Sequence, residues 1–282
     1  MTEIVGKTYT EERALFGSRD LALENCVFGG EDESPLKECH GVRARKCAFE
    51  NKYPIWYSRD LDIEDCFFDV GARAGLWYCE DVRLANCVYG AVKGLRRLKN
   101  MRLERVSFTS ADETLWDCKN VQGFELSARG DYFAMNSENM VFDGLNLVGN
   151  YSFDGCKNVQ IKNAKILGRD AFWNCENILI KDSYLSGKYF GWNSRRVRLE
   201  NCVVESLQGF CYIEGLTLEN CVLPATSLAF EYSSDVRASV RGRIESVKNP
   251  TSGEIIAEQI GEIIGDEIDR KRVKIITDGK EW

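Results

Sequence analysis

Apolar residues recur along this chain in a pattern that repeats every 19 to 21 residues. The repeat is clearest in RDLALENCVF from Arg19, RDLDIEDCFF from Arg59 and RRVRLENCVV from Arg195. Its first aliphatic position is occupied by Leu21, Val42, Leu61, Val82, Met101, Val121, Met140, Val159, Ile178, Val197, Leu216 and Val236. A second, mostly apolar series lies two residues later, from Leu23 to Ala238. Because side chains alternate between two faces along a strand, this spacing predicts β-strands.

Two further series complete the repeat. A bend is predicted just after the second apolar position, because asparagine and aspartate tolerate left-handed backbone conformations. The residues at this bend are Asn25, Asp65, Asn86, Asn163, Asp182, Asn201 and Asn220. A third apolar series follows: Leu36, Ile55, Leu76, Leu95, Leu115, Phe133, Phe153, Phe172, Phe190, Phe210 and Leu228. Each repeat therefore supplies two or three short strands joined by turns.

One such repeat cannot bury its own apolar face, whereas repeats stacked about 4.8 Å apart build a continuous core. The sequence therefore predicts an all-β protein, a β-solenoid of about 11 to 12 coils in one domain. Coils are expected over 19–245, an N-terminal cap over 1–18 with a short helix in 8–16, and a C-terminal cap or final coils over 246–282. A leucine-rich repeat has a similar period but needs a denser leucine pattern, so it is the less favoured alternative. The isoleucines of 255–268 fit either a helix or strands.

Twelve cysteines are present, yet no C-x-x-C pair occurs and His40 is the only histidine. Many of the cysteines fall at one place in the repeat, as do Cys26, Cys47, Cys66 and Cys87. We therefore expect stacked inward thiols, no metal site and no cofactor.

The net charge of -7 disfavours binding to nucleic acid or to an anionic membrane surface. The first residues lack the pattern of an export signal, and no run of 18 apolar residues occurs. A cytoplasmic location is expected.

The segments between the strands contain short sequence motifs: KYPIWY at 52, RAGLWY at 73, ETLW at 113, GDYFAMNS at 130, GNYSFDG at 149 and RDAFWNCEN at 169. Together they resemble a bacterial family of pectin-lyase-like proteins described as domain of unknown function 3737. The resemblance spans essentially the whole chain. It implies a right-handed parallel β-helix and favours strands over a helix at the C-terminal end. It brings no established activity, cofactor or catalytic residue.

A candidate binding surface follows the third apolar series. If that series points inward, the next residue points outward, and this column reads Lys37, Trp56, Trp77, Arg96, Trp116, Ala134, Asp154, Trp173, Gly191, Cys211 and Ala229. Indole rings flanked by charges suit a sugar, whose apolar face lies on an aromatic ring. The predicted substrate-binding residues are Lys37, Trp56, Trp77, Arg96, Arg97, Trp116, Trp173 and Trp192.

Carboxylates on the same side give a candidate catalytic set: Glu113, Asp131, Asp154 and Asp170. Glycoside hydrolysis needs two carboxyl groups about 5 to 9.5 Å apart, which adjacent or alternate coils supply. The signature motifs of pectate lyases are absent, as is a counterpart of the polygalacturonase histidine. An enzyme of this kind would be a glycoside hydrolase or a polysaccharide lyase.

Two functions stay open on the sequence. The first is a protein that binds or processes a carbohydrate on the tryptophan and carboxylate face. The second is a non-catalytic scaffold whose aromatic face contacts another protein or a second copy of the chain, giving a homo-oligomer.

Overall fold

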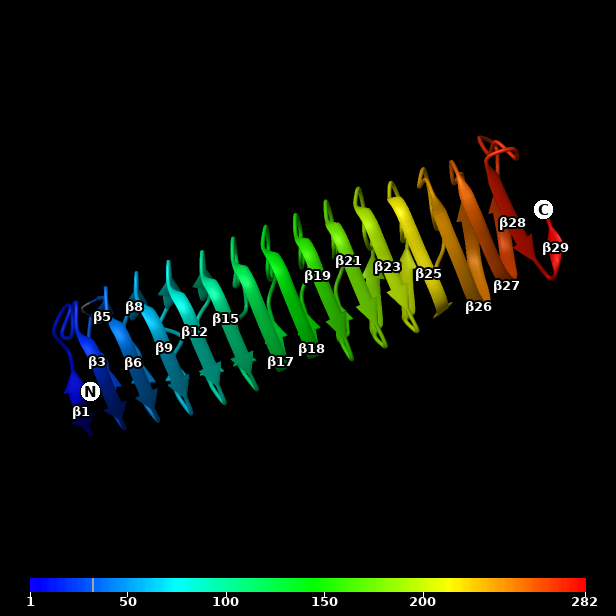
Figure 1. Cartoon of the computed structure of the whole chain (residues 1–282). Helices are drawn as coiled ribbons and strands as arrows, with labels where there is room; N and C mark the ends of the chain where they lie inside the picture. The colour runs from blue at the N-terminus through cyan, green and yellow to red at the C-terminus, as the bar shows by residue number, and fades with distance from the viewer. Residues whose placement is uncertain (32) are drawn as a thin grey trace. The chain divides into compact units, whose positions relative to one another are not determined.

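The computed structural model of the protein describes residues 1–31 and 33–282. It divides into two compact units, Met1–Asn146 and Leu147–Trp282. In both, short parallel strands stack turn upon turn, and the described residues form a β-solenoid of about 14 turns with no helix (Figure 1). The predicted all-β solenoid is confirmed. No helix in the described ranges is long and apolar enough to cross a membrane.

In the first unit a typical turn contributes a six-residue strand and a two-residue strand. These strands are β1 (Thr2–Val5), β2 (Thr8–Tyr9), β3 (Arg19–Glu24), β4 (Val27–Phe28), β6 (His40–Arg45), β7 (Ala48–Phe49), β9 (Arg59–Glu64), β10 (Phe67–Phe68), β12 (Glu80–Ala85), β13 (Val88–Tyr89), β15 (Lys99–Glu104), β16 (Ser107–Phe108), β17 (Lys119–Arg129) and β18 (Glu138–Val148), whose last two residues belong to the second unit. Four turns add a third strand, and these form a separate four-stranded sheet: β5 (Leu36–Lys37), β8 (Ile55–Trp56), β11 (Leu76–Trp77) and β14 (Leu95–Arg96).

The second unit repeats this plan with longer strands toward its end. Its strands are β19 (Lys157–Lys162), β20 (Lys165–Leu167), β21 (Glu176–Lys181), β22 (Tyr184–Lys188), β23 (Arg195–Glu200), β24 (Val203–Leu207), β25 (Glu214–Val222), β26 (Val236–Lys248), β27 (Gly253–Ile264), β28 (Val273–Thr277) and β29 (Lys280–Glu281). The isoleucine-rich segment is therefore strand, with β27 paired in parallel to β26 and β28. The chain then turns back, and β29 pairs antiparallel to β28.

The segment expected to form a short helix near the N-terminus does not. Thr8–Tyr9 is strand β2, which pairs with β4, and turns follow it. A nine-residue helix is marginal on its own, whereas pairing with the next turn satisfies backbone groups directly. Because both end segments add turns of their own, the solenoid has more turns than the 11 to 12 predicted.

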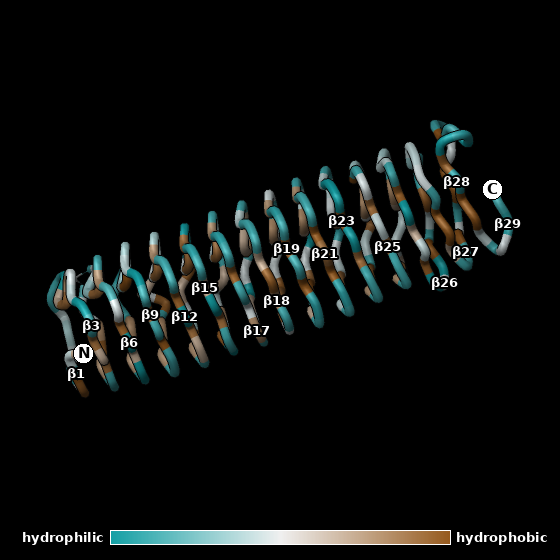
Figure 2. Tube along the Cα trace, in the orientation of Figure 1, coloured by the Kyte–Doolittle hydropathy of each residue, from teal (hydrophilic) through white to brown (hydrophobic). Residues whose placement is uncertain are grey.

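The turns stack in register, so equivalent residues pair. Val42 pairs with Leu21 on one side and with Leu61 on the other, and all three are buried. Apolar positions recur at the same place in successive turns (Figure 2). The predicted bend residues Asn25, Asp65 and Asn86 have φ of 53°, 55° and 51°, as left-handed turns require.

An aromatic column runs through the core of the first unit. Tyr9, Phe28, Phe49, Phe68 and Tyr89 stack in sequence, with centroid distances of 5.2, 5.1, 4.7 and 4.7 Å. Such offset contacts between rings stabilise beyond the area they bury.

All twelve cysteines are buried and free of disulfides. Burial raises the pKa of the Cys39 thiol and that of the Cys87 thiol to about 11 each. The Cys39 and Cys87 thiols are therefore protonated at neutral pH, and the buried cysteines pack as small, weakly polar groups.

We predict that Phe68→Ala lowers the free energy of unfolding by about 3–5 kcal/mol, because it opens a cavity between two stacked rings. Phe67→Ala is the matched control: Phe67 precedes Phe68 on the opposite face and is 43% exposed, so a loss of about 1 kcal/mol or less is expected. Guanidinium unfolding followed by circular dichroism measures both. Equal losses would contradict the inward placement of Phe68.

Candidate functional site

The predicted outward residues of the first unit form a continuous line, which we call the aromatic stripe: Lys37, Trp56, Trp77, Arg96 and Trp116. The small sheet aligns them, since Trp56 pairs with Lys37 and with Trp77, Trp77 with Arg96, and Arg96 bridges to Trp116. Each side chain is half-buried, whereas the residue before it is buried. The strand alternation assumed from the sequence therefore holds along this line.

Stacking along the stripe covers both faces of the Trp77 ring and one face each of the Trp56 and Trp116 rings. The rings of Trp56 and Trp77 lie 5.2 Å apart and 7° from parallel. The Arg96 guanidinium carbon lies 5.1 Å from the Trp77 ring centroid and 4.2 Å from that of Trp116, in cation–π contact with both. The rings therefore present mainly their edges outward.

The indole N–H groups are also engaged. Nε1 of Trp56 donates to the carbonyl of Ala74 at 2.7 Å, and Nε1 of Trp77 donates to that of Lys93 at 2.8 Å. Nε1 of Trp116 donates to the carbonyl of Tyr132 at 2.5 Å. Each indole thus ties its own turn to the next, which makes the stripe rigid.

A second column, which we call the tyrosine flank, lies beside the stripe and consists of Tyr57, Tyr78 and Arg97. The two tyrosine rings stack at 4.7 Å and 2°, and Tyr57 is 50% exposed. Nη1 of Arg97 donates to the Tyr78 hydroxyl at 2.7 Å. All three residues have positive φ, between 53° and 59°.

Glu113 and Asp131 lie in consecutive turns of the first unit, where the Glu113 N–H donates to the Asp131 carbonyl at 2.9 Å. The Glu113 carboxylate pairs with Arg96 and, at 3.4 Å, with Lys93. Partial burial acts to raise the pKa of Glu113, but the hydrogen bond from Arg96 and the Lys93 charge outweigh it and lower the pKa. Glu113 is thus an ion-paired carboxylate and a poor proton donor at neutral pH.

The other two predicted catalytic residues belong to the second unit. The Asp154 carboxylate accepts a hydrogen bond from Asn174 at 2.9 Å. Asp170 is only 4% exposed, and burial raises its pKa; Arg169 approaches it at 3.6 Å. A raised pKa is what a general acid needs, so Asp170 is the member of the set with that property. The catalytic role of all four carboxylates stays a prediction.

The register expected for the outward column is wrong in several turns. Ala134, Gly191, Cys211 and Ala229 are buried. The inward residue paired with Phe210 is Phe230, whose ring stacks on it at 5.8 Å, rather than Leu228. Trp192, one residue after Gly191, is the outward side chain beside Trp173, with 6.0 Å between ring centroids. The left-handed positions show the cause: Ala134, Gly191 and Phe230 are the equivalents of Leu115, Phe172 and Phe210. The third apolar series taken from the sequence is therefore one or two residues out of register in those turns.

A hollow of the first unit lies on the outward side of β9, β12, β15 and β17, away from the candidate residues predicted from the sequence. We call it the strand groove; its volume is about 550 Å³. Its side chains are mostly polar: Asp60, Asp62, Asp81, Arg83, Asn100, Arg102, Asn120 and Gln122. A signal exists in the sequence, since the residue between the two aliphatic series of each turn is charged or polar in β6, β9, β12, β15 and β17.

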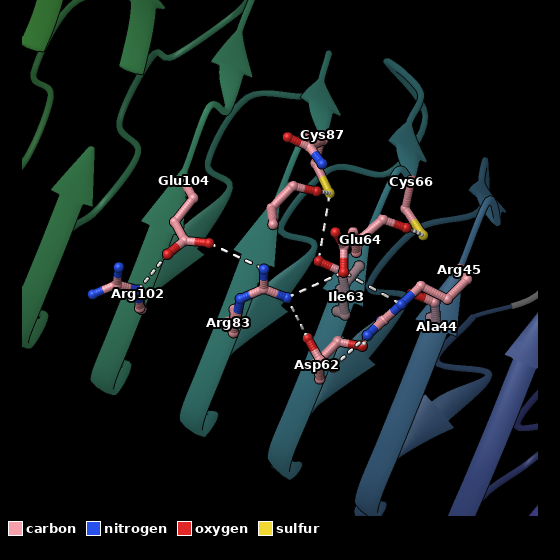
Figure 3. A network of polar contacts seen from close by, with 12 residues as sticks. Ala44, Arg45, Asp62, Ile63, Glu64, Cys66, Arg83, Cys87, Arg102 and Glu104 are labelled. Atoms are coloured by element: carbon pink, nitrogen blue, oxygen red, sulfur yellow. Dashed lines mark hydrogen bonds and ion pairs between the residues drawn. The ribbon is translucent and has the colours of Figure 1, made fainter. Parts of the chain in front are cut away.

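Ion pairs hold the side chains of the strand groove in place (Figure 3). The Asp62 carboxylate binds Arg45 and, at 2.8 Å, Arg83. Arg83 also reaches Glu104 at 3.0 Å, and Glu104 pairs with Arg102. Burial acts to raise the pKa of Asp62, but hydrogen bonds from both arginines outweigh it and lower the pKa. The hydrogen bond from Arg102 lowers the pKa of Glu104.

One rim of the strand groove is a ladder of side-chain amides. Nδ2 of Asn120 donates to Oδ1 of Asn100, and Nδ2 of Asn100 donates to Oδ1 of Asp81, each at 2.9 Å. Each bond uses one of the two hydrogens on an amide nitrogen. The second hydrogens of these two amides are available to a ligand.

A second hollow of about 360 Å³ lies on the same outward side of β1, β3 and β6. Its lining includes Arg43 and Arg45 together with Glu3 and Glu24. Because β6 pairs with β9, the two hollows are neighbours. The ion pair between Arg45 and Asp62 separates them.

The stacked parallel turns and their inward ladders define the class of this protein as a parallel β-solenoid. More specifically, the family model described as "Protein of unknown function (DUF3737)" matches residues 2–277, and the chain belongs to that family. The resemblance noted in the sequence is thereby confirmed.

Among solved structures, the chain is similar to PfbA, a surface adhesin of Streptococcus pneumoniae, at 9% identity, covering 91% of this chain and 81% of that one, with a TM-score of 0.45. It is also similar to the A-module of the mannuronan C-5 epimerase AlgE6 of Azotobacter vinelandii, at 10% identity, covering 94% and 91%, with a TM-score of 0.36. A third is the catalytic domain of a GH87 alpha-1,3-glucanase, at 9% identity, covering 97% and 63%, with a TM-score of 0.29. No curated protein matches the chain. These likenesses say nothing about a shared activity.

We predict that Asp62→Asn lowers the free energy of unfolding by about 1 kcal/mol at neutral pH, since Arg45 and Arg83 lose an anionic partner that is partly exposed to solvent. The pKa of Asp62 is lowered on folding, so its contribution is present above the ordinary pKa of about 3.9 and is lost as the pH falls through the lower folded value. The difference between the two proteins should therefore shrink below about pH 4.

Urea unfolding at a series of pH values measures this. Asp65→Asn is the control, because Asp65 forms no ion pair within the described residues and asparagine occupies the same bend in other turns. An equal loss in the free energy of unfolding for both variants would show that Asp62 does not stabilise the fold through Arg45 and Arg83.

Proposed function

We propose that the protein binds an uncharged carbohydrate in the strand groove without cleaving it. The observation that carries this proposal is a hollow of about 550 Å³ lined by planar polar side chains from four successive turns. Ligand sites are concave, and carboxylate, guanidinium and amide groups form paired hydrogen bonds with neighbouring hydroxyls. An open hollow lined by such groups suits a hydroxyl-rich ligand.

The repeat length of the groove supports a chain-like ligand. Equivalent side chains recur at each turn, about 4.8 Å apart, which is close to the length of one sugar unit in an extended chain. Amide groups of the rim therefore meet successive sugar units in equivalent ways.

The charges in the groove support an uncharged sugar over a uronate. The lining contains three carboxylates, those of Asp60, Asp62 and Asp81, and two guanidiniums, those of Arg83 and Arg102. Both guanidiniums are already paired with carboxylates. An added anion would meet a surplus of negative charge.

The same ion pairs favour binding over hydrolysis. Hydrolysis requires one carboxylic acid that keeps its proton near neutral pH. Among the ion-paired side chains of the strand groove, Asp62 and Glu104 have lowered pKa values because arginines stabilise their charged forms. Neither residue meets that requirement.

The substrate-binding role predicted from the sequence stays a prediction. It concerns the stripe residues Lys37, Trp56, Trp77, Arg96 and Trp116, Arg97 beside them, and Trp173 and Trp192 in the second unit. Stacking within the stripe leaves ring edges rather than faces for a sugar. The groove is therefore the preferred place for the ligand.

A screen of uncharged and uronate-containing oligosaccharides, followed by calorimetry, tests the proposal. An uncharged oligosaccharide should bind, and Gln122→Ala should weaken binding about 3- to 10-fold, the effect of losing one or two hydrogen bonds. Gln160→Ala is the matched control, because the sequence KNVQ occurs at both 119–122 and 157–160 and both glutamines are exposed. It should leave the affinity unchanged.

Other outcomes count against the proposal. Equal losses for Gln122→Ala and Gln160→Ala would remove the groove from binding. A loss with Trp116→Ala alone would place the ligand on the aromatic stripe. Release of shorter sugars would show an enzyme, and Asp131→Asn and Asp170→Asn would then test the predicted catalytic carboxylates.

A further inference from the structure

The order of cations and aromatic rings along the aromatic stripe has a self-complementary form. From one end to the other the stripe contains a cation, two aromatic rings, a cation and an aromatic ring: Lys37, Trp56, Trp77, Arg96 and Trp116. Reversed about its centre, Trp77, the order places Lys37 opposite Trp116 and Trp56 opposite Arg96. No cation of one copy then faces a cation of the other.

The tyrosine flank has the same property about the same turn. Tyr78 lies in the central turn, with Tyr57 one turn before it and Arg97 one turn after it. Reversal about Tyr78 places Tyr57 opposite Arg97. Both columns therefore match a reversed copy of themselves around one centre.

A two-fold axis produces this reversal. If the axis runs along β11 in the plane of the exposed face, it reverses the order of turns and preserves the direction of the strands. The face of one copy then meets the same face of another, as in an isologous dimer. We propose that the aromatic stripe and the tyrosine flank are the contact between two copies of this chain related by such an axis.

The chemistry of the surface fits this role. Tyrosine, tryptophan and arginine are the residues that most often anchor protein interfaces. Tyr57 is 50% exposed, although its ring stacks on Tyr78. The indoles are fixed by hydrogen bonds to the next turn, so little side-chain freedom is lost on association.

One pair in this arrangement is unfavourable. Glu38 and Asp117 occupy the equivalent positions one turn before and one turn after the flank, and they face each other across the axis. They lie at the rim, where water screens charges, and Asp117 is already within 3.5 Å of Arg97 in its own chain. The surface also spans only five turns, whereas a standard interface buries about 800 Å² per partner. The dimer is therefore weak and its population depends on concentration.

Sedimentation velocity over a series of protein concentrations tests the proposal, with circular dichroism to verify folding. Wild type should pass from monomer to dimer as the concentration rises. Tyr57→Arg places a guanidinium opposite Arg97 of the second copy and should weaken the dimer at least tenfold. The fold should tolerate it, because Arg97 already occupies the same left-handed position in this column, with φ of 55° against 53° for Tyr57.

A mixing experiment tests the pairing of residues. Arg97→Tyr alone should also weaken the dimer, because it removes the cation that faces Tyr57. When Tyr57→Arg and Arg97→Tyr chains are mixed in equal amounts, each heterodimer again pairs an arginine with a tyrosine at both contacts, so association should return. Tyr212→Arg, which changes a tyrosine of the second unit that is 42% exposed and also has positive φ, is the control and should dimerise like wild type.

The proposal is overturned if wild type is monomeric at every concentration, if Tyr57→Arg dimerises as well as wild type, or if the mixed variants do not associate. None of these residues lines the strand groove, so the outcome is independent of carbohydrate binding.

Discussion

In-register pairing between successive turns is the constraint on which this structure depends. Each turn is too small to bury an apolar face, and its strands have no partners within the turn. Stacking solves both problems together, since the backbone of Val42 bonds to the turns of Leu21 and Leu61 while the three side chains meet in the core. Every residue is therefore placed directly beside its equivalents, about 4.8 Å away.

That constraint decides which side chains the core accepts. Flat rings stack well at this distance, as Phe49 and Phe68 do at 4.7 Å. Thiols also fit, because they are small and weakly polar, which explains free cysteines at repeated positions. The cysteines are thus part of the packing, and the surfaces that can contact a ligand or a second protein lie on the outward side of the strands.

The same constraint shapes the two outward surfaces in different ways. On the small sheet it stacks tryptophans and places Arg96 between two of them, giving a rigid surface of ring edges. On the larger sheet it brings charged side chains of neighbouring turns together, and the Asp62 carboxylate pairs with both Arg45 and Arg83. The result there is a fixed network of ionised groups around a hollow, suited to hydrogen bonding and poorly suited to proton transfer.

The sequence by itself determined the repeat, the strands, the inward columns and the outward direction of Trp56 and Trp77, because strand alternation and stacking are local consequences of spacing. It did not determine where the third apolar series lies in every turn: Phe230 rather than Leu228 stacks on Phe210, and Trp192 rather than Gly191 lies beside Trp173. It also did not reveal that the indole faces are covered or that Asp62, Arg83 and Gln122 surround a hollow. Those features depend on distances between side chains of different turns, and only the tertiary structure sets those distances.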